Sequence, residues 1–231
     1  STIAKLADHT LYTWAGPEIA VATTKGYTTQ LSVLYLFALY VAKKMERIGE
    51  EEFFALLRTL KTLPKKIQEA LDMNSAIPNL SKKYHDTGSM FFIGRNTDYS
   101  VALEGALKMK EISYIHAESY AAGELKHGTI ALIEEHQPVV ALCCNESIRE
   151  KTMSNIVEVK ARGAEVLAVT FHGNQKIVSL ADDVVFVPKV ETVFSAIVEI
   201  IPLQLFAYYV AKENGCDIDK PKNLAKSVTV E

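Results

Sequence analysis

MFFIGRNTDYSVALEGALKMKEISYI, residues 90–115, is the stretch of sequence that decides the fold. Its first four residues, Met90–Ile93, are apolar and predict a buried strand, and the glycine after them indicates a turn. The residues that follow predict a helix over Tyr99–Ile115. The stretch therefore has the strand–turn–helix order of a protein in which helices cover a parallel sheet.

The same alternation continues to the end of the chain. Further strands are predicted over 138–143, 165–170 and 184–187, and helices over 148–162 and 193–212. Pro202 lies inside the last of these helices and is expected to kink it. Strands that alternate with helices imply an α/β fold, a doubly wound parallel sheet covered on both faces.

The sequence also contains an internal similarity. FALYVAK at residues 37–43 recurs as FAYYVAK at 206–212, and LAD at 6–8 recurs as LAD at 180–182. Each Ala-Asp precedes a strand-like run, 10–13 or 184–187, and then a glutamate and an apolar helix. The matched order predicts two copies of one α/β unit, although two buried helices can also resemble each other by chance. By this logic the first copy would begin about 80 residues before Ser1.

These features predict how the chain is organised. A complete second copy is preceded by the C-terminal part of a truncated first copy, and helices broken by prolines join the two. The predicted segments are the end of the first unit (1–49), the connecting helices (50–86), the second unit (87–216) and a C-terminal active-site tail (217–231).

Composition excludes several classes of protein. Hydrophobic residues make up 48% of the 231 and charged residues 23%, and the net charge is −3 without a basic stripe, which argues against nucleic acid as a partner. The longest apolar stretch, Val33–Ala42, is too short to span a bilayer. Three cysteines match no disulfide or zinc pattern, and no signal peptide is predicted. A reducing, cytoplasmic location is expected.

Four residues could carry chemistry. Lys108 and Glu111 share one face of the predicted helix, as an ordinary surface salt bridge or as a base beside a positive charge. Their helix follows the end of the strand 90–93, so we expect them near the carboxyl ends of the strands, where open α/β sheets bind ligands. His127, in the loop sequence GELKHG, is an exposed loop histidine or an acid–base group near neutral pH. Lys226 lies among small and β-branched residues in a tail that is expected to pack. It is a surface lysine, or an amine that forms a Schiff base with a sugar carbonyl.

His116, Glu118, Glu124 and His127 carry side chains that could bind a metal ion. Their spacing does not match the His-Glu-x-x-His pattern of a zinc-binding helix. We therefore predict no metal and no cofactor.

Three long motifs resemble the isomerase half of the glucosamine-6-phosphate synthases, the glutamine–fructose-6-phosphate aminotransferases. They are PEIAVATTKGYTTQL at 17–31, EGALKMKEISYIHAESYAAGELKHG at 104–128 and NLAKSVTVE at 223–231. The resemblance covers essentially all 231 residues. It implies two sugar-isomerase (SIS) domains, and a parent chain that also carries a glutaminase domain. That parent would convert fructose 6-phosphate and glutamine-derived ammonia to glucosamine 6-phosphate.

The resemblance also implies roles for particular residues. Glu111 would shuttle a proton between adjacent sugar carbons, and Lys108 would stabilise the charged intermediate. His127 would open the sugar ring in the neighbouring subunit of a homodimer, and Lys226 would form the Schiff base. Val21, Thr23 and Ala225 would contact the sugar; many family members have serine where Thr23 stands.

Part of the family pattern is missing. The phosphate loop of the first domain, a Ser-Gln-Ser-x-x-Thr type run, has no match in these residues. We therefore expect this chain alone to be inactive. Two alternatives stay open: a related SIS-domain sugar-phosphate isomerase or deglycase, and a non-catalytic sugar-phosphate-binding regulatory module. The regulatory reading would require an attached helix-turn-helix and a basic face, and the sequence predicts neither.

Overall fold

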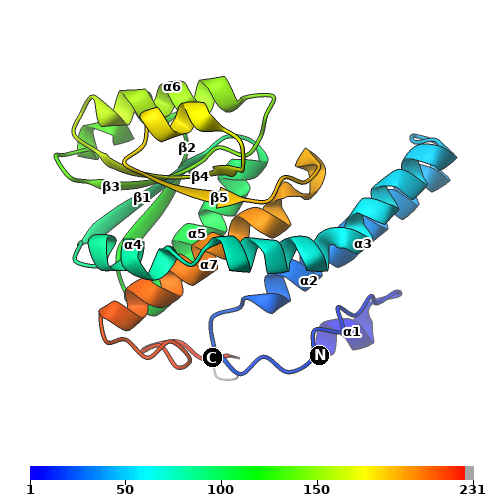
Figure 1. Cartoon of the computed structure of the whole chain (residues 1–231). Coiled ribbons are helices and arrows are strands. Elements are labelled where there is room, and N and C mark those ends of the chain that lie inside the picture. Colours follow the sequence, from blue (N-terminus) through cyan, green and yellow to red (C-terminus); the bar gives the residue numbers. More distant parts are fainter. Residues whose placement is uncertain (227–231) are drawn as a thin grey trace.

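A five-stranded, fully parallel sheet forms the centre of the computed structural model, which describes residues 1–226 (Figure 1). The strand order is β2-β1-β3-β4-β5, so the chain reverses direction across the sheet between β1 and β3. The strands are β1 (Ser89–Gly94), β2 (His116–Ala121), β3 (Pro138–Leu142), β4 (Glu165–Phe171) and β5 (Asp183–Val187). The doubly wound α/β prediction is confirmed for this unit.

Helices cover both faces of the sheet. Helices α5 (Thr97–Ser113) and α7 (Ser195–Glu213) lie on one face, and α6 (Arg149–Lys160) lies on the other (Figure 1). Because side chains alternate along a strand, Met90 and Phe92 of β1 pack toward α5 and α7, whereas Phe91 and Ile93 pack toward α6. One sheet therefore supports two separate apolar cores.

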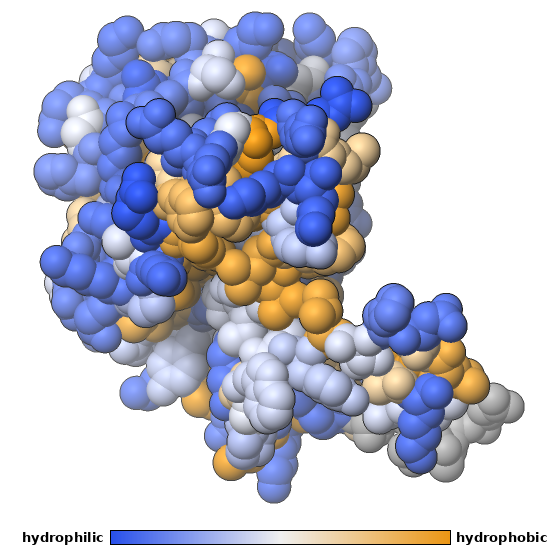
Figure 2. All heavy atoms as spheres, turned by 90° about the vertical axis from the view of Figure 1, so that its right-hand side faces the viewer, coloured by the Kyte–Doolittle hydropathy of each residue, from blue (hydrophilic) through white to orange (hydrophobic). Residues whose placement is uncertain are grey.

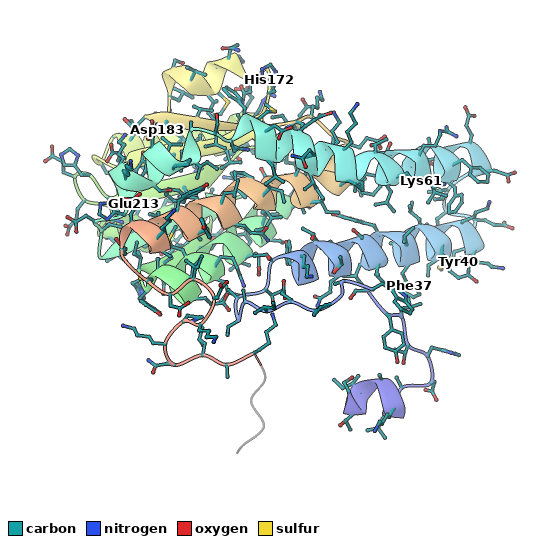
Figure 3. The ribbon with its side chains drawn as sticks, turned by 60° about the horizontal axis from the view of Figure 1, so that its bottom comes forward. Phe37, Tyr40, Lys61, His172, Asp183 and Glu213 are labelled. Atoms are coloured by element: carbon teal, nitrogen blue, oxygen red, sulfur yellow. The ribbon has the colours of Figure 1, made fainter. Side chains whose placement is uncertain are left out.

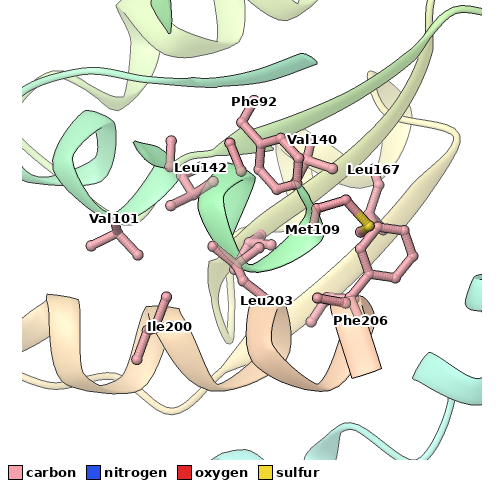
Figure 4. Close-up of a cluster of buried hydrophobic side chains, with 14 of the residues drawn as sticks. Phe92, Val101, Met109, Val140, Leu142, Leu167, Ile200, Leu203 and Phe206 are labelled. Carbon is pink, nitrogen blue, oxygen red and sulfur yellow. The ribbon is translucent and has the colours of Figure 1, made fainter. Parts of the chain in front are cut away.

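The core on the α5 side depends on a close helix–helix contact. A Cβ atom on Gly105 would lie 2.6 Å from Leu203 Cδ1 of α7 and 3.2 Å from Phe92 Cε1 of the sheet. Leu203 and Phe92 are buried with Met109 and Phe206 in the cluster of Figure 4. The absence of a side chain at Gly105 lets α5 fit between the sheet and α7.

The N-terminal helices extend away from this body. They are α1 (Thr2–Leu6), α2 (Lys25–Lys44), α3 (Glu50–Met73) and α4 (Ile77–Tyr84). In Figure 1, α2 and α3 project together beyond the edge of the sheet. Short 3-10 helices complete the described residues: η1 (Leu125–His127), η2 (Thr129–Leu132), η3 (Gln175–Ser179) and η4 (Thr192–Phe194).

Two local predictions are wrong, and one strand was not predicted. The run 10–13 does not form a strand, because no strand lies beside it within residues 1–226. Pro64 does not break α3, because Leu60, Leu63 and Ala70 form one buried face that continues across the exposed proline. Strand β2, with the sequence HAESYA, was missed because its residues are mostly polar, as an edge strand allows.

One described helix is long and apolar enough to cross a membrane. It spans Thr192–Glu213, but 67% of its most apolar window is buried inside the protein. This is the behaviour of a core helix, and it agrees with the packing of α7 against the sheet.

A carboxylate occupies the crevice at the carboxyl ends of β1 and β3. Doubly wound sheets bind their ligands at this reversal point. Here Asp98 Oδ2 accepts hydrogen bonds from the backbone N–H groups of Cys144 (3.0 Å) and Asn145 (3.1 Å), and Asp98 is fully buried. The amides that could bind an anion are therefore already paired with a side chain of the protein.

A second buried acid lies near Asp98. Glu199 of α7 is fully buried, and neither of its carboxylate oxygens has a hydrogen-bond partner in the described residues. Burial first, and then the charge of Asp98, raise the pKa of Glu199 to about 8. Burial also raises the pKa of Asp98 to about 6, although the two backbone N–H groups act against the increase.

We predict that Glu199→Gln reduces the fall in the free energy of unfolding as the pH rises. Folding raises the pKa of Glu199 from 4.5 to about 8, so the folded protein binds the extra proton and its stability falls as the pH rises through that window. The amide cannot ionise, so the variant should gain stability over the parent as the pH rises from 4.5 to about 8. Urea unfolding at several pH values measures this. Glu213→Gln, at an exposed helix end, is the control, and equal pH slopes in all three proteins would contradict the prediction.

Candidate functional site

The C-terminal tail lies beside the segment that precedes α2. The two run next to each other in Figures 1 and 3, and the N–H of Val21 donates a 2.9 Å hydrogen bond to the carbonyl of Asp219. Asp217 stabilises the turn between α7 and the tail, since its Oδ1 accepts from the N–H groups of Asp219 (3.0 Å) and Lys220 (2.9 Å). The Val21–Asp219 hydrogen bond therefore joins the C-terminal tail to the segment that precedes α2.

Lys226 ends in a cluster of oxygen atoms from that segment. Its Nζ lies 2.7 Å from Glu18 Oε2, 2.9 Å from the carbonyl oxygen of Ala20, and 3.4 Å from both Val21 O and Thr23 Oγ1. The structure thus joins three residues that were predicted separately: Lys226, Val21 and Thr23. Ala225, the fourth predicted residue of this group, is exposed beside Lys226. Residues 227–231, the end of the predicted active-site tail, lie outside the described residues.

Glu18 was not predicted as a site residue. Its second oxygen, Oε1, accepts from the backbone N–H groups of Thr24 (2.9 Å) and Gly26 (3.3 Å), which begin α2. Burial would raise the pKa of Glu18, but the Lys226 ammonium and these two N–H groups outweigh it and lower the pKa to about 2. The sequence contains one indication of its importance: Glu18 follows the strand-like run 10–13, just as a glutamate follows the run 184–187 in the internal similarity.

Lys108 and Glu111 form a buried ion pair. Lys108 is 3% exposed, and its Nζ lies 2.5 Å from Glu111 Oε2 and 3.4 Å from Glu104 Oε1. Burial is the main reason that the pKa of Glu104 is raised, and the nearby Lys108 charge only partly offsets it. Because the ammonium is buried between two carboxylates, this is not the exposed surface salt bridge that spacing alone also allowed.

Their position in the fold differs from the expectation. Lys108 and Glu111 were expected near the carboxyl ends of the strands, because their helix follows the end of β1. Helix α5 runs back along the sheet, so its last turns lie near the amino end of β2. The carboxyl-end crevice contains Asp98 instead.

A small cavity connects Lys108 with the segment that Lys226 contacts. Its volume is about 200 Å³, which is below the 300–1,000 Å³ typical of ligand pockets. Its walls come from the segment before α2, the last turns of α5, α7 and the tail: Ala20, Ala22, Thr24, Lys108, Ile112, Gln204, Tyr208, Ile218 and Asp219. Residues 20–24 therefore line the cavity together with Lys108 and also provide contacts to Lys226.

His127 is not part of this arrangement. It lies in η1, beyond the carboxyl end of β2, whereas Glu111 lies near the amino end of that strand. Its side chain is 64% exposed, and its Nε2 is 3.9 Å from Glu124 Oε2. The structure thus brings Lys108 and Glu111 together, and Lys226 with Val21 and Thr23, but places His127 at the opposite end of the sheet.

The described part of the chain contains no candidate metal site. Within residues 1–226, no group of three or more His, Cys, Asp or Glu side chains could hold a metal ion. The arrangement offers carboxylates, two lysine amines and hydroxyl groups, which suit proton transfer and imine chemistry.

Known proteins resemble this chain along its whole length. It is 50% identical over 231 residues to the glutamine–fructose-6-phosphate aminotransferase (isomerizing) of Clostridium tetani, of which it covers 38%. It superposes with a TM-score of 0.92 and 37% identity on the C-terminal domain of glucosamine-fructose-6-phosphate aminotransferase from Francisella tularensis. That match covers 96% of this chain and 62% of the other.

A more distant enzyme shares the fold. Glucosamine-6-phosphate deaminase from Thermotoga maritima gives a TM-score of 0.71 at 25% identity, over 99% of this chain and 63% of the other. The sequence profile of the SIS domain matches residues 83–213, which contain the whole parallel sheet. The chain therefore belongs to the SIS domain family, and it is similar to the C-terminal part of the glutamine–fructose-6-phosphate aminotransferases.

Proposed function

We propose that this chain supplies the base and the amine of a sugar-phosphate isomerase site. In the longer protein this site converts fructose 6-phosphate and glutamine-derived ammonia to glucosamine 6-phosphate. One observation carries the proposal: the Lys226 amine lies against residues 18–23, and the adjoining residues share a cavity with Lys108, the partner of Glu111. The 50% identity to an aminotransferase of that reaction supports the choice of substrate.

Glu111 is the base in this proposal. Moving a proton between C1 and C2 of a sugar requires one group that reaches both carbons, and the Glu111 side chain remains 23% exposed. Lys108 orients one of its oxygens at 2.5 Å and places positive charge near the negative charge that would develop as C1 loses its proton.

Lys226 forms the covalent intermediate. Its neutral amine attacks C2 of the open ketose, and the carbonyl oxygen leaves as water. Ammonia then adds to C2 and displaces the lysine amine, and the resulting sugar imine makes the C1 proton more acidic. Glu18 pairs with the ammonium form of Lys226, so the sugar must draw the amine away from Glu18 and the amine must lose a proton. His127 then belongs to the site of a neighbouring subunit in a homodimer, as its distance from Glu111 along the sheet supports.

Glu111→Gln should abolish isomerisation but preserve sugar binding. The amide keeps the shape and the contact with Lys108, but it cannot accept a proton. In the full-length protein we expect C1–C2 proton exchange to fall by about 10²–10⁴-fold, while the dissociation constant for fructose 6-phosphate changes little. Isotope exchange followed by NMR, together with calorimetry, measures both. Glu135→Gln, at an exposed glutamate, is the control, and normal exchange in Glu111→Gln would assign Glu111 a structural role only.

Lys226 should be trapped as a reduced imine. Borohydride added to the full-length protein with fructose 6-phosphate should increase the mass of the peptide that contains Lys226, and Lys226→Arg should prevent this increase. An adduct on another lysine would refute the assignment. Product formation with and without ammonia separates amination from isomerisation alone. The 231-residue chain by itself should react slowly, since the phosphate loop that the resemblance implies has no match in these residues.

The exposed face of α2 supports the proposal of a second unit. Phe206 of FAYYVAK is 2% exposed where α7 covers the sheet, but Phe37 of the related FALYVAK is 52% exposed. Phe37 and Tyr40 point away from α3 in Figure 3, and apolar side chains are also exposed on the side of the molecule seen in Figure 2. We propose that α2 covers the sheet of a further α/β unit in the longer protein.

Trp14 can report on this docking. It is the only tryptophan in the sequence and is 91% exposed. If the chain is extended at its N-terminus to the length of its relatives, Trp14 fluorescence should shift to the blue and iodide quenching should fall severalfold, because the proposed unit covers residues 10–14. Unchanged quenching in a folded, extended protein would contradict the second unit at this surface.

A further inference from the structure

Tyr114 contacts the tail four residues before Lys226. Its hydroxyl oxygen accepts a 2.8 Å hydrogen bond from the backbone N–H of Lys222, and Lys222 Nζ lies 4.2 Å from the centre of the Tyr114 ring. One side chain therefore contacts both the backbone and the side chain of the same tail residue. The ring supplies a cation–π contact and the hydroxyl fixes the position of the chain.

The backbone of Tyr114 is unusual for an aromatic residue. It forms the C-cap of α5 in the left-handed region, with φ of 63° and ψ of 8°. Glycine or asparagine is favoured at this position, and a bulky residue there is strained. This strain is maintained at a position whose side chain reaches the tail, and such outliers occur preferentially at functional sites.

We propose that Tyr114 is a positioning residue that holds the tail so that the Lys226 amine stays in register with the base on α5. Glu111 lies three residues before Tyr114 on the same helix, and Lys226 lies four residues after Lys222. Tyr114 thus connects the element that carries the base to the element that carries the amine. The inference rests on the proposed function for its catalytic meaning, but the connection itself can be tested separately.

Two substitutions distinguish the effect of the Tyr114 side-chain contacts from the effect of its backbone strain. Tyr114→Phe removes the hydroxyl and keeps the ring and the backbone conformation. Tyr114→Gly removes the whole contact and also relieves the left-handed conformation, so the body of the protein should melt at the same or a higher temperature. Tyr40→Phe, at an exposed tyrosine of α2, is the matched control.

The first measurement is amide hydrogen exchange of Lys222 and of Val21, which donates to the tail at Asp219, in the 231-residue chain. Loss of one hydrogen bond should accelerate exchange at Lys222 about fivefold in Tyr114→Phe and more in Tyr114→Gly, and not in Tyr40→Phe. A side chain that only stabilised the core would instead lower the melting temperature of Tyr114→Gly. Exchange at the parent rate in both folded variants would overturn the connection.

The second measurement is the rate of borohydride trapping at Lys226 in the full-length protein. Tyr114→Phe should slow trapping about fivefold at saturating fructose 6-phosphate, with sugar affinity unchanged. Parent-like trapping despite faster exchange would overturn the positioning role. If the unsubstituted protein shows no trapping at all, the proposed function fails, while the exchange experiment still decides whether Tyr114 holds the tail.

Discussion

The close approach of α5 to α7 at Gly105 is the constraint on which the site depends. A side chain at Gly105 would overlap with Leu203, so the two helices pack at this distance only because position 105 has none. Lys108, Glu111 and Tyr114 follow within the next turns of α5, and their places are set by this contact. Because a packed interior resists even the addition of one methyl group, small changes there would move Glu111 relative to the tail.

The sequence predicted the elements that have strong apolar character. Strands β1, β3, β4 and β5 and helices α5, α6 and α7 were located to within a few residues, since their apolar side chains form the two cores. The polar strand β2 was missed because an edge strand needs little apolar surface. The error at 10–13 has a different cause: strand formation requires a neighbouring strand, which a local pattern cannot supply.

The site was predicted in its parts but not in its assembly. Lys226, Val21 and Thr23 came from two motifs at opposite ends of the chain, and the structure brings them within 3.4 Å. Glu18 and Tyr114 were missed because their roles are to accept hydrogen bonds from backbone N–H groups, which motif spacing does not reveal. The position of Lys108 and Glu111 was misjudged because it depends on the direction in which α5 returns along the sheet.

Glu18 has a consequence for the reorganisation of the site. Removing the only partner of a buried carboxylate normally costs several kcal/mol of stability. Glu18 would retain the N–H groups of Thr24 and Gly26, and the positive end of the α2 dipole, after the lysine moved away. In the proposed reaction, the amine would therefore exchange its carboxylate partner for a substrate without leaving an uncompensated charge behind. A helix that itself takes no part in the chemistry would lower the energetic barrier to that exchange.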